Sequence, residues 1–443
     1  MVHHQPASRS SRLIAVFSLL VIASLSCNLV APQPTASTRP TATPAPDLQA
    51  TALYESTSTA PAQQNPVATS TAVSQTTNSN DASAPQGWSF DLASGPTTMN
   101  TQGRGLFANV MLDGDTLIVT YQTAPANTIS DNKSLYYRTY DRSLGELTGE
   151  QFAIDVNAPS ELVDWKGDLG DQKLTLMGDY IYMVALIREQ PQVGIMKFDK
   201  SFNAVTSPLY LGNPDKFVEA PTDMGFINDG QHVYVQLQTR KGDNPMTDWG
   251  AALYQVTADL ETKNIAFVYP EGGSFVTGTA VLFVPKGEMG MSEDRLQIFS
   301  SNKDYGNRER VGLHTFGATM RLEYIADSRV DIVERELDVY FPTGPSFNTK
   351  HHLWVVGYSM ENFEGDHGGP DGLELGPSFI EIFNTEWNSL ETIPVNGSSP
   401  AFRVMTQTVG DDIYVVYDEM DKQGSAATSR ARIEHYTITA PQP

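Results

Sequence analysis

A tight glycine turn followed by an alternating strand recurs along this chain and limits what it can fold into. The clearest copy covers residues 176–184 and reads LMGDYIYMV. Three further copies cover residues 112–119, 228–235 and 409–416. Glycine enters tight turns at little steric cost. We therefore interpret each copy as the turn that leads into the second strand of a repeated β unit.

The spacing of the turn glycines indicates a repeat architecture. Gly114 and Gly178 are 64 residues apart, Gly178 and Gly230 are 52 apart, and Gly230 and Gly410 are 180 apart. The last interval has room for two less regular copies, at 294–299 and 351–356, which keep the strand and lose the Gly-Asp turn. A second alternating run follows each of the six copies. These runs are 135–141, 193–199, 252–257, 311–316, 379–384 and 433–438.

The turn-and-strand copies and the alternating runs that follow them each occur six times, which predicts six units. Preceding strands such as 107–112 and trailing strands such as 150–155 would give each unit four strands. One such unit cannot bury its own faces, so the sequence predicts an all-β, six-bladed β-propeller over residues 87–440. Residues 88–92 would supply the strand that the sixth unit lacks and close the ring. Seven blades, or two stacked β-sandwiches, are the alternatives, and helix should be scarce because no long window has a 3.6-residue apolar period.

The N-terminal segment has the pattern of an export signal. Residues 1–26 combine Arg9 and Arg12 with an apolar run too short to span a membrane. The only cysteine, Cys27, follows Leu25-Ser26 at the end of that run. This stretch resembles the lipobox of bacterial lipoproteins, with its leucine one place later than usual. The resemblance implies lipid attachment at Cys27; the alternative is a free cysteine in a signal peptide cut elsewhere.

Residues 27–86 have the composition of a tether. They are mostly Thr, Ser, Pro, Ala and Gln, which bury too little apolar surface to offset the entropy of ordering. The formal net charge of −23 argues against nucleic acid or an anionic membrane surface as partner. We expect a monomer on the extracytoplasmic side of a bacterial cell envelope, which contacts the membrane only through its N-terminal lipid.

Familiar catalytic signatures are absent from the sequence, which contains no HExxH, GxSxG, GxxxxGK or cysteine pair. Residues 302–306, NKDYG, resemble a degenerate Asp-box, a turn found in sialidases, in which only Asp304 and Gly306 match. Arg104 precedes Gly114 by about the distance at which sialidases place a substrate-binding arginine. The resemblance implies a sialidase-like glycosidase, for which Glu323-Tyr324 is one of many possible nucleophile pairs.

The loops between the second and third strands vary most in length, so we expect the binding face there. Candidate binding residues are Trp249, Tyr305, Arg308, Phe363, Asp366, His367 and Asp371. The acidic loop 361–374 also offers Glu364, Asp366 and Asp371 as oxygen ligands for Ca²⁺, although a solvated insertion explains the same residues. No cofactor is required. His351 and His352 should point to opposite faces of one strand, and Tyr180, Tyr182, Tyr234 and Tyr414 should pack between blades.

These patterns favour a binding or scaffolding module for an extracellular glycan or protein. The alternative is a propeller-type carbohydrate-active enzyme, either a sialidase-like glycoside hydrolase or a polysaccharide lyase. An enzyme should gather carboxylates, or a tyrosine with a glutamate and arginines, at one channel mouth. A mouth of mixed polar and aromatic residues would favour binding.

Overall fold

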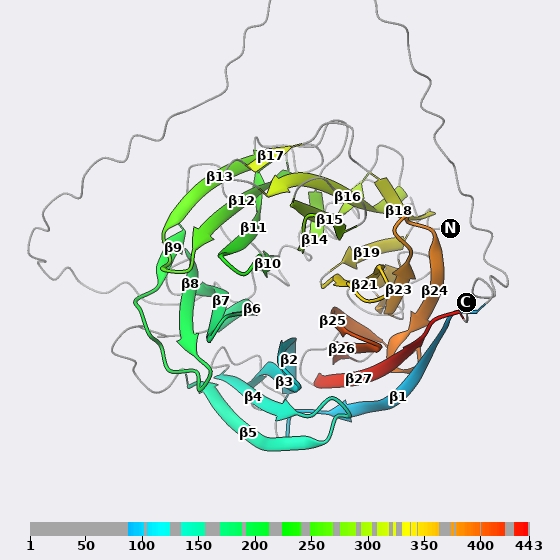
Figure 1. Cartoon of the computed structure of the whole chain (residues 1–443), viewed down its shortest axis with the longest axis horizontal. Coiled ribbons are helices and arrows are strands. Elements are labelled where there is room, and N and C mark those ends of the chain that lie inside the picture. The colour runs from blue at the N-terminus through cyan, green and yellow to red at the C-terminus, as the bar shows by residue number, and fades with distance from the viewer. Residues whose placement is uncertain are drawn as a thin grey trace, which may run out of the picture. The chain divides into compact units, whose positions relative to one another are not determined.

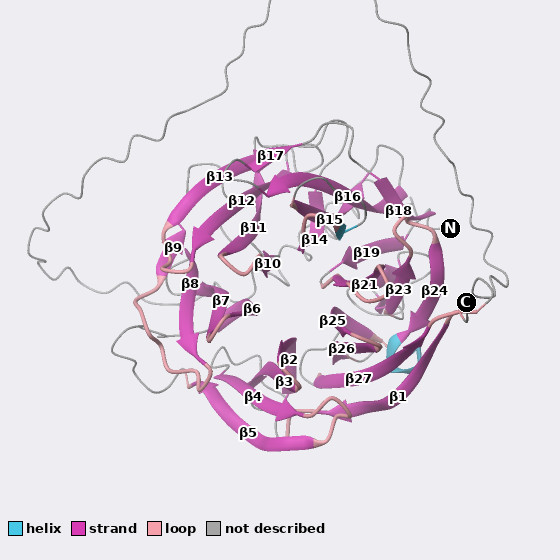
Figure 2. Cartoon of the chain, in the orientation of Figure 1, coloured by secondary structure: helices cyan, strands magenta, loops and turns pink. Residues whose placement is uncertain are grey.

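The chain is almost entirely β in the computed structural model (Figure 2). The structure describes residues 87–101, 104–124, 134–155, 169–187, 192–211, 224–240, 249–268, 275–288, 294–303, 308–318, 322–324, 330–336, 338–342, 344–362, 374–375, 378–398, 400–420 and 429–441. Within these ranges, one 3₁₀ turn, η2 (Val395–Ser398), lies among 27 strands. None of the described helical segments is long and apolar enough to cross a membrane.

The strands form six antiparallel sheets, which we call blades 1 to 6 in chain order. Blade 1 contains β2 (Arg104–Asp113), β3 (Thr116–Ala124), β4 (Ser134–Tyr140) and β5 (Glu146–Ile154). Blade 2 contains β6 (Leu169–Met177), β7 (Tyr180–Ile187), β8 (Gln192–Asp199) and β9 (Leu209–Leu211). Blade 3 contains β10 (Met224–Asn228), β11 (His232–Arg240), β12 (Trp249–Thr257) and β13 (Thr262–Val268).

Blades 4 and 5 keep the same plan with interrupted strands. Blade 4 contains β14 (Phe275–Val284), β15 (Arg295–Lys303), β16 (Arg308–Ala318), β17 (Leu322–Tyr324) and β18 (Val330–Glu336). Blade 5 contains β19 (Asp338–Pro342), β20 (Ser346–Asn348), β21 (Leu353–Asn362), β22 (Glu374–Leu375), β23 (Phe379–Phe383) and β24 (Ser389–Pro394). Both β17 and β18 pair with β16, and both β19 and β20 pair with β21. The fourth strand of blade 4 and the first strand of blade 5 are therefore each broken in two.

The first and last parts of the folded domain meet in blade 6. This blade contains β25 (Ala401–Val409), β26 (Asp412–Glu419), β27 (Arg430–Thr439) and β1 (Ser89–Thr98). β1 pairs with β27 from Ser89 opposite Thr439 to Thr98 opposite Arg432. The predicted closing strand is thus confirmed, and it extends further than residues 88–92.

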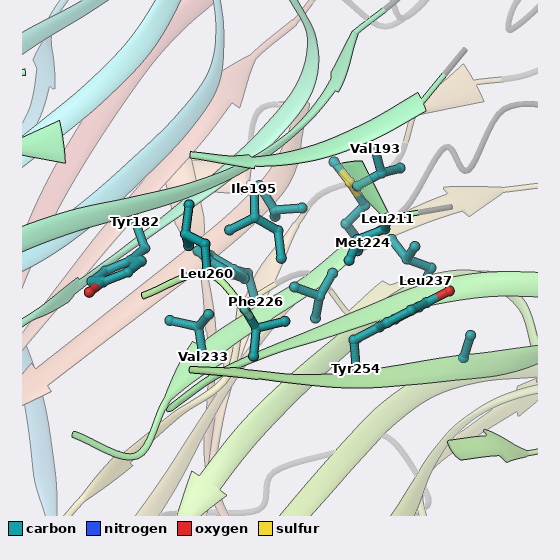
Figure 3. Close-up of a cluster of buried hydrophobic side chains, with 14 of the residues drawn as sticks. Tyr182, Val193, Ile195, Leu211, Met224, Phe226, Val233, Leu237, Tyr254 and Leu260 are labelled. Carbon is teal, nitrogen blue, oxygen red and sulfur yellow. The ribbon is translucent and has the colours of Figure 1, made fainter. Parts of the chain in front are cut away.

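The blades are arranged as a ring (Figure 1), with the first strand of each near the axis and the fourth at the rim. The predicted all-β propeller with four-stranded antiparallel blades is confirmed. The core explains why the units need one another, because each of six buried clusters joins two neighbouring blades. Figure 3 shows the cluster between blades 2 and 3, where Tyr182 and Ile195 face Phe226 and Val233.

The turns between first and second strands follow the glycine prediction. Gly114, Gly178, Gly230 and Gly410 have φ values of 60°, 61°, 86° and 60°, which glycine adopts readily. In blade 5 the corresponding turn carries His352 with φ 53°. His351 and His352 both lie in this turn before β21. The prediction that they share a strand is therefore wrong.

A second repeated turn, between third and fourth strands, escaped the sequence analysis. Each copy places a large apolar residue in the left-handed region three or four residues after the strand. These residues are Leu144, Phe202, Leu260 and Trp387, with φ of 61–64°. A side chain three residues earlier accepts backbone N–H bonds; Asp199, for example, accepts them from Ser201 and Asn203. Phe202 and Leu260 are buried in blade interfaces. The apolar side chains of these turns therefore help to fill the interfaces between blades.

The prediction for the strand tyrosines is confirmed in part. Tyr182, Tyr234 and Tyr414 are buried in clusters that join neighbouring blades. Tyr180 is 39% exposed, and the Lys197 ammonium lies 4.3 Å from its ring centroid. The packing prediction is wrong for Tyr180, because it stands at the turn end of β7 and lies outside the interface.

Candidate binding channel

A cavity of about 360 Å³ lies on the propeller axis and is bordered by residues of all six blades. Its wall is made by the first strand of each blade, the strands nearest the centre in Figure 1. Such a strand has a neighbour on one side only. Every second backbone N–H and C=O group is consequently available on the side that faces the axis. The fold itself therefore supplies hydrogen-bonding groups to this channel.

Blades 5 and 6 contact each other closely at the channel wall. Gly344 and Met405 form an isolated bridge between parallel segments, and Thr406 N donates to Gly344 O at 3.0 Å. A Cβ atom on Gly344 would lie 2.6 Å from the Met405 Cα. Only glycine allows this approach. The Thr406 hydroxyl donates to the same carbonyl oxygen and also lies 2.8 Å from Ser346 Oγ.

Polar side chains of the wall are largely fixed by bonds between blades. Asn228 of blade 3 donates to Thr175 Oγ1 at 2.6 Å and to Leu176 O at 3.0 Å, both in blade 2. Lys173 is the only ionisable side chain among the described wall residues and is 8% exposed. The wall between these polar side chains is lined by Met111, Phe226 and other apolar residues. The described wall thus mixes apolar surface with fixed donors and acceptors and contains no carboxylate.

Four of the inner strands bulge beyond the channel residues, on the side away from the glycine turns. Two consecutive residues leave the ladder in β2, β6, β14 and β25. In β2 and β25 the first of the two is Phe107, with φ 56°, and Arg403, with φ 53°. This conformation is unfavourable for both residue types. The bulge turns the backbone N–H groups of Phe107 and Ala108 toward blade 6.

A fully buried carboxylate accepts hydrogen bonds from those N–H groups. Asp418 of β26 accepts bonds from Phe107 N at 3.0 Å and from Ala108 N at 3.2 Å. Arg403 Nη1 lies 3.6 Å from Asp418 Oδ2, and the guanidinium carbon lies 3.9 Å from the Phe107 ring centroid. A buried carboxylate needs such partners, because its desolvation is otherwise costly.

A cluster of amides at the joint between blades 1 and 2 contacts the same bulge. Gln172 Nε2 donates to Phe107 O at 3.0 Å, and Gln122 Nε2 donates to Gln172 Oε1 at 2.5 Å. Asn109 Nδ2 donates to the same Phe107 carbonyl. The bulge is consequently held on both sides, by an acid from blade 6 and by amides from blades 1 and 2.

Ion pairs join blades at the opposite, glycine-turn end of the ring. Lys350 and His351 of blade 5 lie 2.6 and 2.7 Å from Asp411 of blade 6. The hydrogen bonds from Lys350 and His351 hold the pKa of Asp411 below its usual value. Arg142 of blade 1 lies 3.3 Å from Asp412 of blade 6. Because these charges are partly exposed, each pair contributes little stability on its own.

The residues chosen from the sequence as binding or metal sites are not brought together within the described structure. Trp249 and Arg308 begin β12 and β16, with side chains outside the described part. The remaining candidates all lie outside the described residues: Cys27, Tyr305, Phe363, Glu364, Asp366, His367 and Asp371. So do the Arg104 and Glu323-Tyr324 side chains and residues Asp304 and Gly306. Elsewhere in the described ranges, no group of three or more His, Cys, Asp or Glu residues is placed to hold a metal ion.

Sequence reasoning missed Arg403 and Asp418, although a signal for Arg403 was available. Phe107 and Arg403 each stand seven residues before a turn glycine, Gly114 and Gly410. Counting back from the repeated turn therefore finds the bulge. Asp171 occupies the same place before Gly178, and its side chain is outside the described part. Nothing in the sequence singles out Asp418, because its role depends on the neighbouring blade.

Comparison with known proteins gives distant similarities of fold. No protein-family model matches the chain, and no curated protein matches it in sequence. A neuraminidase-like protein from A/bat/Guatemala/164/2009 is 11% identical, with a TM-score of 0.47, over 82% of this chain and 96% of that one. Bacillus subtilis levansucrase is 10% identical, with a TM-score of 0.41, over 68% and 88%.

Puromycin hydrolase, solved as an S511A mutant complexed with PGG, is 12% identical, with a TM-score of 0.40. The match covers 77% of this chain and 56% of the hydrolase. At these identities and TM-scores, no activity is transferred to this chain.

Proposed function

We propose that this protein is a binding module of the bacterial cell surface, lipid-anchored at Cys27, whose propeller holds an extracellular glycan at its axial channel. The observation that carries the proposal is the wall of the channel, which offers donors, acceptors and apolar surface without a carboxylate among its described residues. Its volume of about 360 Å³ is at the small end of ligand pockets. Such a cavity suits the end of a chain better than a folded surface.

The chemistry of the described wall favours binding over hydrolysis. Glycoside hydrolysis ordinarily needs two carboxylates, or a tyrosine activated by one, facing a common space. Lys173 is the only ionisable group that the described wall presents. Among the described residues, the tyrosines that contact a glutamate are not wall residues; Tyr417 and Tyr436, for example, both donate to the buried Glu434. The proposal requires no cofactor, and Ca²⁺ at the acidic loop 361–374 is not part of it.

The remaining parts of the proposal follow from the sequence. Residues 1–26 would direct export, and residues 27–86 would hold the propeller away from the membrane. The net charge of −23 suits a soluble domain outside the cell with no nucleic-acid partner. The module would act as a monomer.

A glycan array probed with the whole mature protein tests this function, together with a panel of chromogenic glycosides. Gln407 lines the channel, so Gln407→Trp should obstruct it. Gln151 lies exposed on the rim strand β5, so Gln151→Trp is the matched control. We expect the wild type to bind at least one glycan class. Gln407→Trp should bind that class about tenfold or more weakly through steric exclusion, and Gln151→Trp should bind it with unchanged affinity. Turnover of any glycoside, or full binding by Gln407→Trp, would overturn the proposal.

A further inference from the structure

Arg403 is a preorganised cation beside the channel. It lies on the innermost strand β25, two residues before the channel residue Met405, or about 7 Å along the strand. Its guanidinium crosses from blade 6 to the Phe107 ring on the innermost strand of blade 1. A quarter of the side chain, 26%, is exposed. We propose that Arg403 binds an oxyanion on the ligand, so that the module selects glycans bearing a carboxylate or a sulfate ester.

The hydrogen-bonding capacity of Arg403 is unused in the described structure. A guanidinium carries five N–H donors in a planar fork that matches an oxyanion. Its nearest acid, Asp418, lies at 3.6 Å, which is too long for a hydrogen bond. The Asp418 oxygens already accept the N–H groups of Phe107 and Ala108. Asp418 therefore orients the arginine without occupying its donors.

The surroundings of the guanidinium would strengthen its interaction with an anion. The Phe107 ring lies 3.9 Å from the guanidinium carbon, and the Phe402 ring lies at 5.0 Å. These rings keep water from part of the group, and charge-assisted bonds gain strength where water is excluded. They also restrict the side chain, so less rotamer entropy is lost when a ligand binds.

The backbone at Arg403 indicates that the side chain itself is needed there. Its φ of 53° would suit glycine at no cost, as in the turns at Gly114 and Gly410. An arginine at such a position must contribute something that offsets the strain. Stacking on Phe107 contributes to stability, whereas the unused donors contribute only when a ligand arrives. Stability and binding measurements can therefore separate the two roles.

The test uses the whole mature protein and three small probes, methyl glucuronide, glucose 6-sulfate and methyl glucoside, titrated by calorimetry. The wild type should bind at least one anionic probe about tenfold more tightly than the neutral one, the gain expected from a hydrogen bond to a charged group. Which anionic probe binds more tightly distinguishes carboxylate from sulfate. Arg403→Gln should reduce the preference to about twofold or less while leaving the neutral affinity unchanged.

Two further variants keep the test decisive. Arg403→Lys retains the charge without the fork and should keep part of the preference, which also covers the case in which Arg403→Gln does not fold. Arg142→Gln removes an arginine of blade 1 that donates to Val409 O at the other end of β25, and this variant should keep the whole preference. An anion preference that survives Arg403→Gln, or equal binding of all three probes by the wild type, would overturn this inference alone. Because the inference rests on the proposed function, absence of binding to any sugar would overturn both.

Discussion

The contact between blades 5 and 6 at Gly344 gives the sharpest stability prediction. An alanine Cβ there would lie 2.6 Å from the Met405 Cα, whereas ordinary contacts begin at 3.4 Å. The two chains would have to separate by about 0.8 Å, the difference between those distances. Overpacking of this kind costs about 1–3 kcal/mol. The separation would also weaken the two bonds that Thr406 donates to Gly344 O, at about 1 kcal/mol each. We expect Gly344→Ala to lower the free energy of unfolding by about 3 kcal/mol.

Gly178→Ala provides the matched substitution. Gly178 has φ 61°, and an added Cβ would meet nothing within 4 Å. Its cost is purely conformational, about 1 kcal/mol, and Gly178→Asn should recover most of it because asparagine tolerates this region. Urea unfolding, with midpoints compared at unchanged slope, measures both variants. Equal losses for Gly344→Ala and Gly178→Ala would show that the inner strands of blades 5 and 6 do not touch, and would refute the reasoning.

Three further predictions concern the acid response, the closure of the ring and the anchor. Burial raises the pKa of Asp229, but bonds from His232 N, Tyr234 and Gln231 N outweigh it and hold that pKa below its usual value. The stabilisation that ionised Asp229 contributes is therefore present above about pH 4 and is lost as the pH falls through the lowered pKa. Asp229→Asn should lower the urea midpoint at pH 7 and approach the wild-type midpoint below about pH 4. A difference in midpoint that stays constant with pH would contradict this. Deleting β1 exposes the edge of β27 and should abolish the cooperative thermal transition, whereas an unchanged transition would exclude a closing role. Cys27→Ala should move the protein from the membrane fraction to the soluble fraction, and continued membrane association would contradict lipidation.

Much of the fold was predictable because one turn recurs. Gly114, Gly178, Gly230 and Gly410 mark the same place in four blades, and the alternating strands after them show which residues face a neighbouring blade. Blades 4 and 5 were harder to predict because their turns depart from this pattern. His352 takes the left-handed conformation without being glycine, and the break between β19 and β20 has no period to mark it.

The candidate site was much less predictable. The variation in loop length pointed to the loops as the binding face, whereas the described channel is built from inner strands whose residues look like ordinary strand residues. Arg403 looks like an ordinary strand residue until its distance from Gly410 is compared with that of Phe107 from Gly114. Asp418 acquires its role through N–H groups more than 300 positions away in the chain, at Phe107 and Ala108. Sequence patterns are local, and the contacts that define this channel are made between blades.

The fate of a bound glycan tests the central claim most directly. The whole mature protein is incubated with a glycan that it retains on the array, and the glycan is then recovered and its mass measured. We expect the recovered glycan to have an unchanged mass and to bind in a one-to-one ratio that Gln407→Trp abolishes. Shortened or unsaturated products that accumulate beyond one equivalent of protein would contradict the account and identify a hydrolase or a lyase.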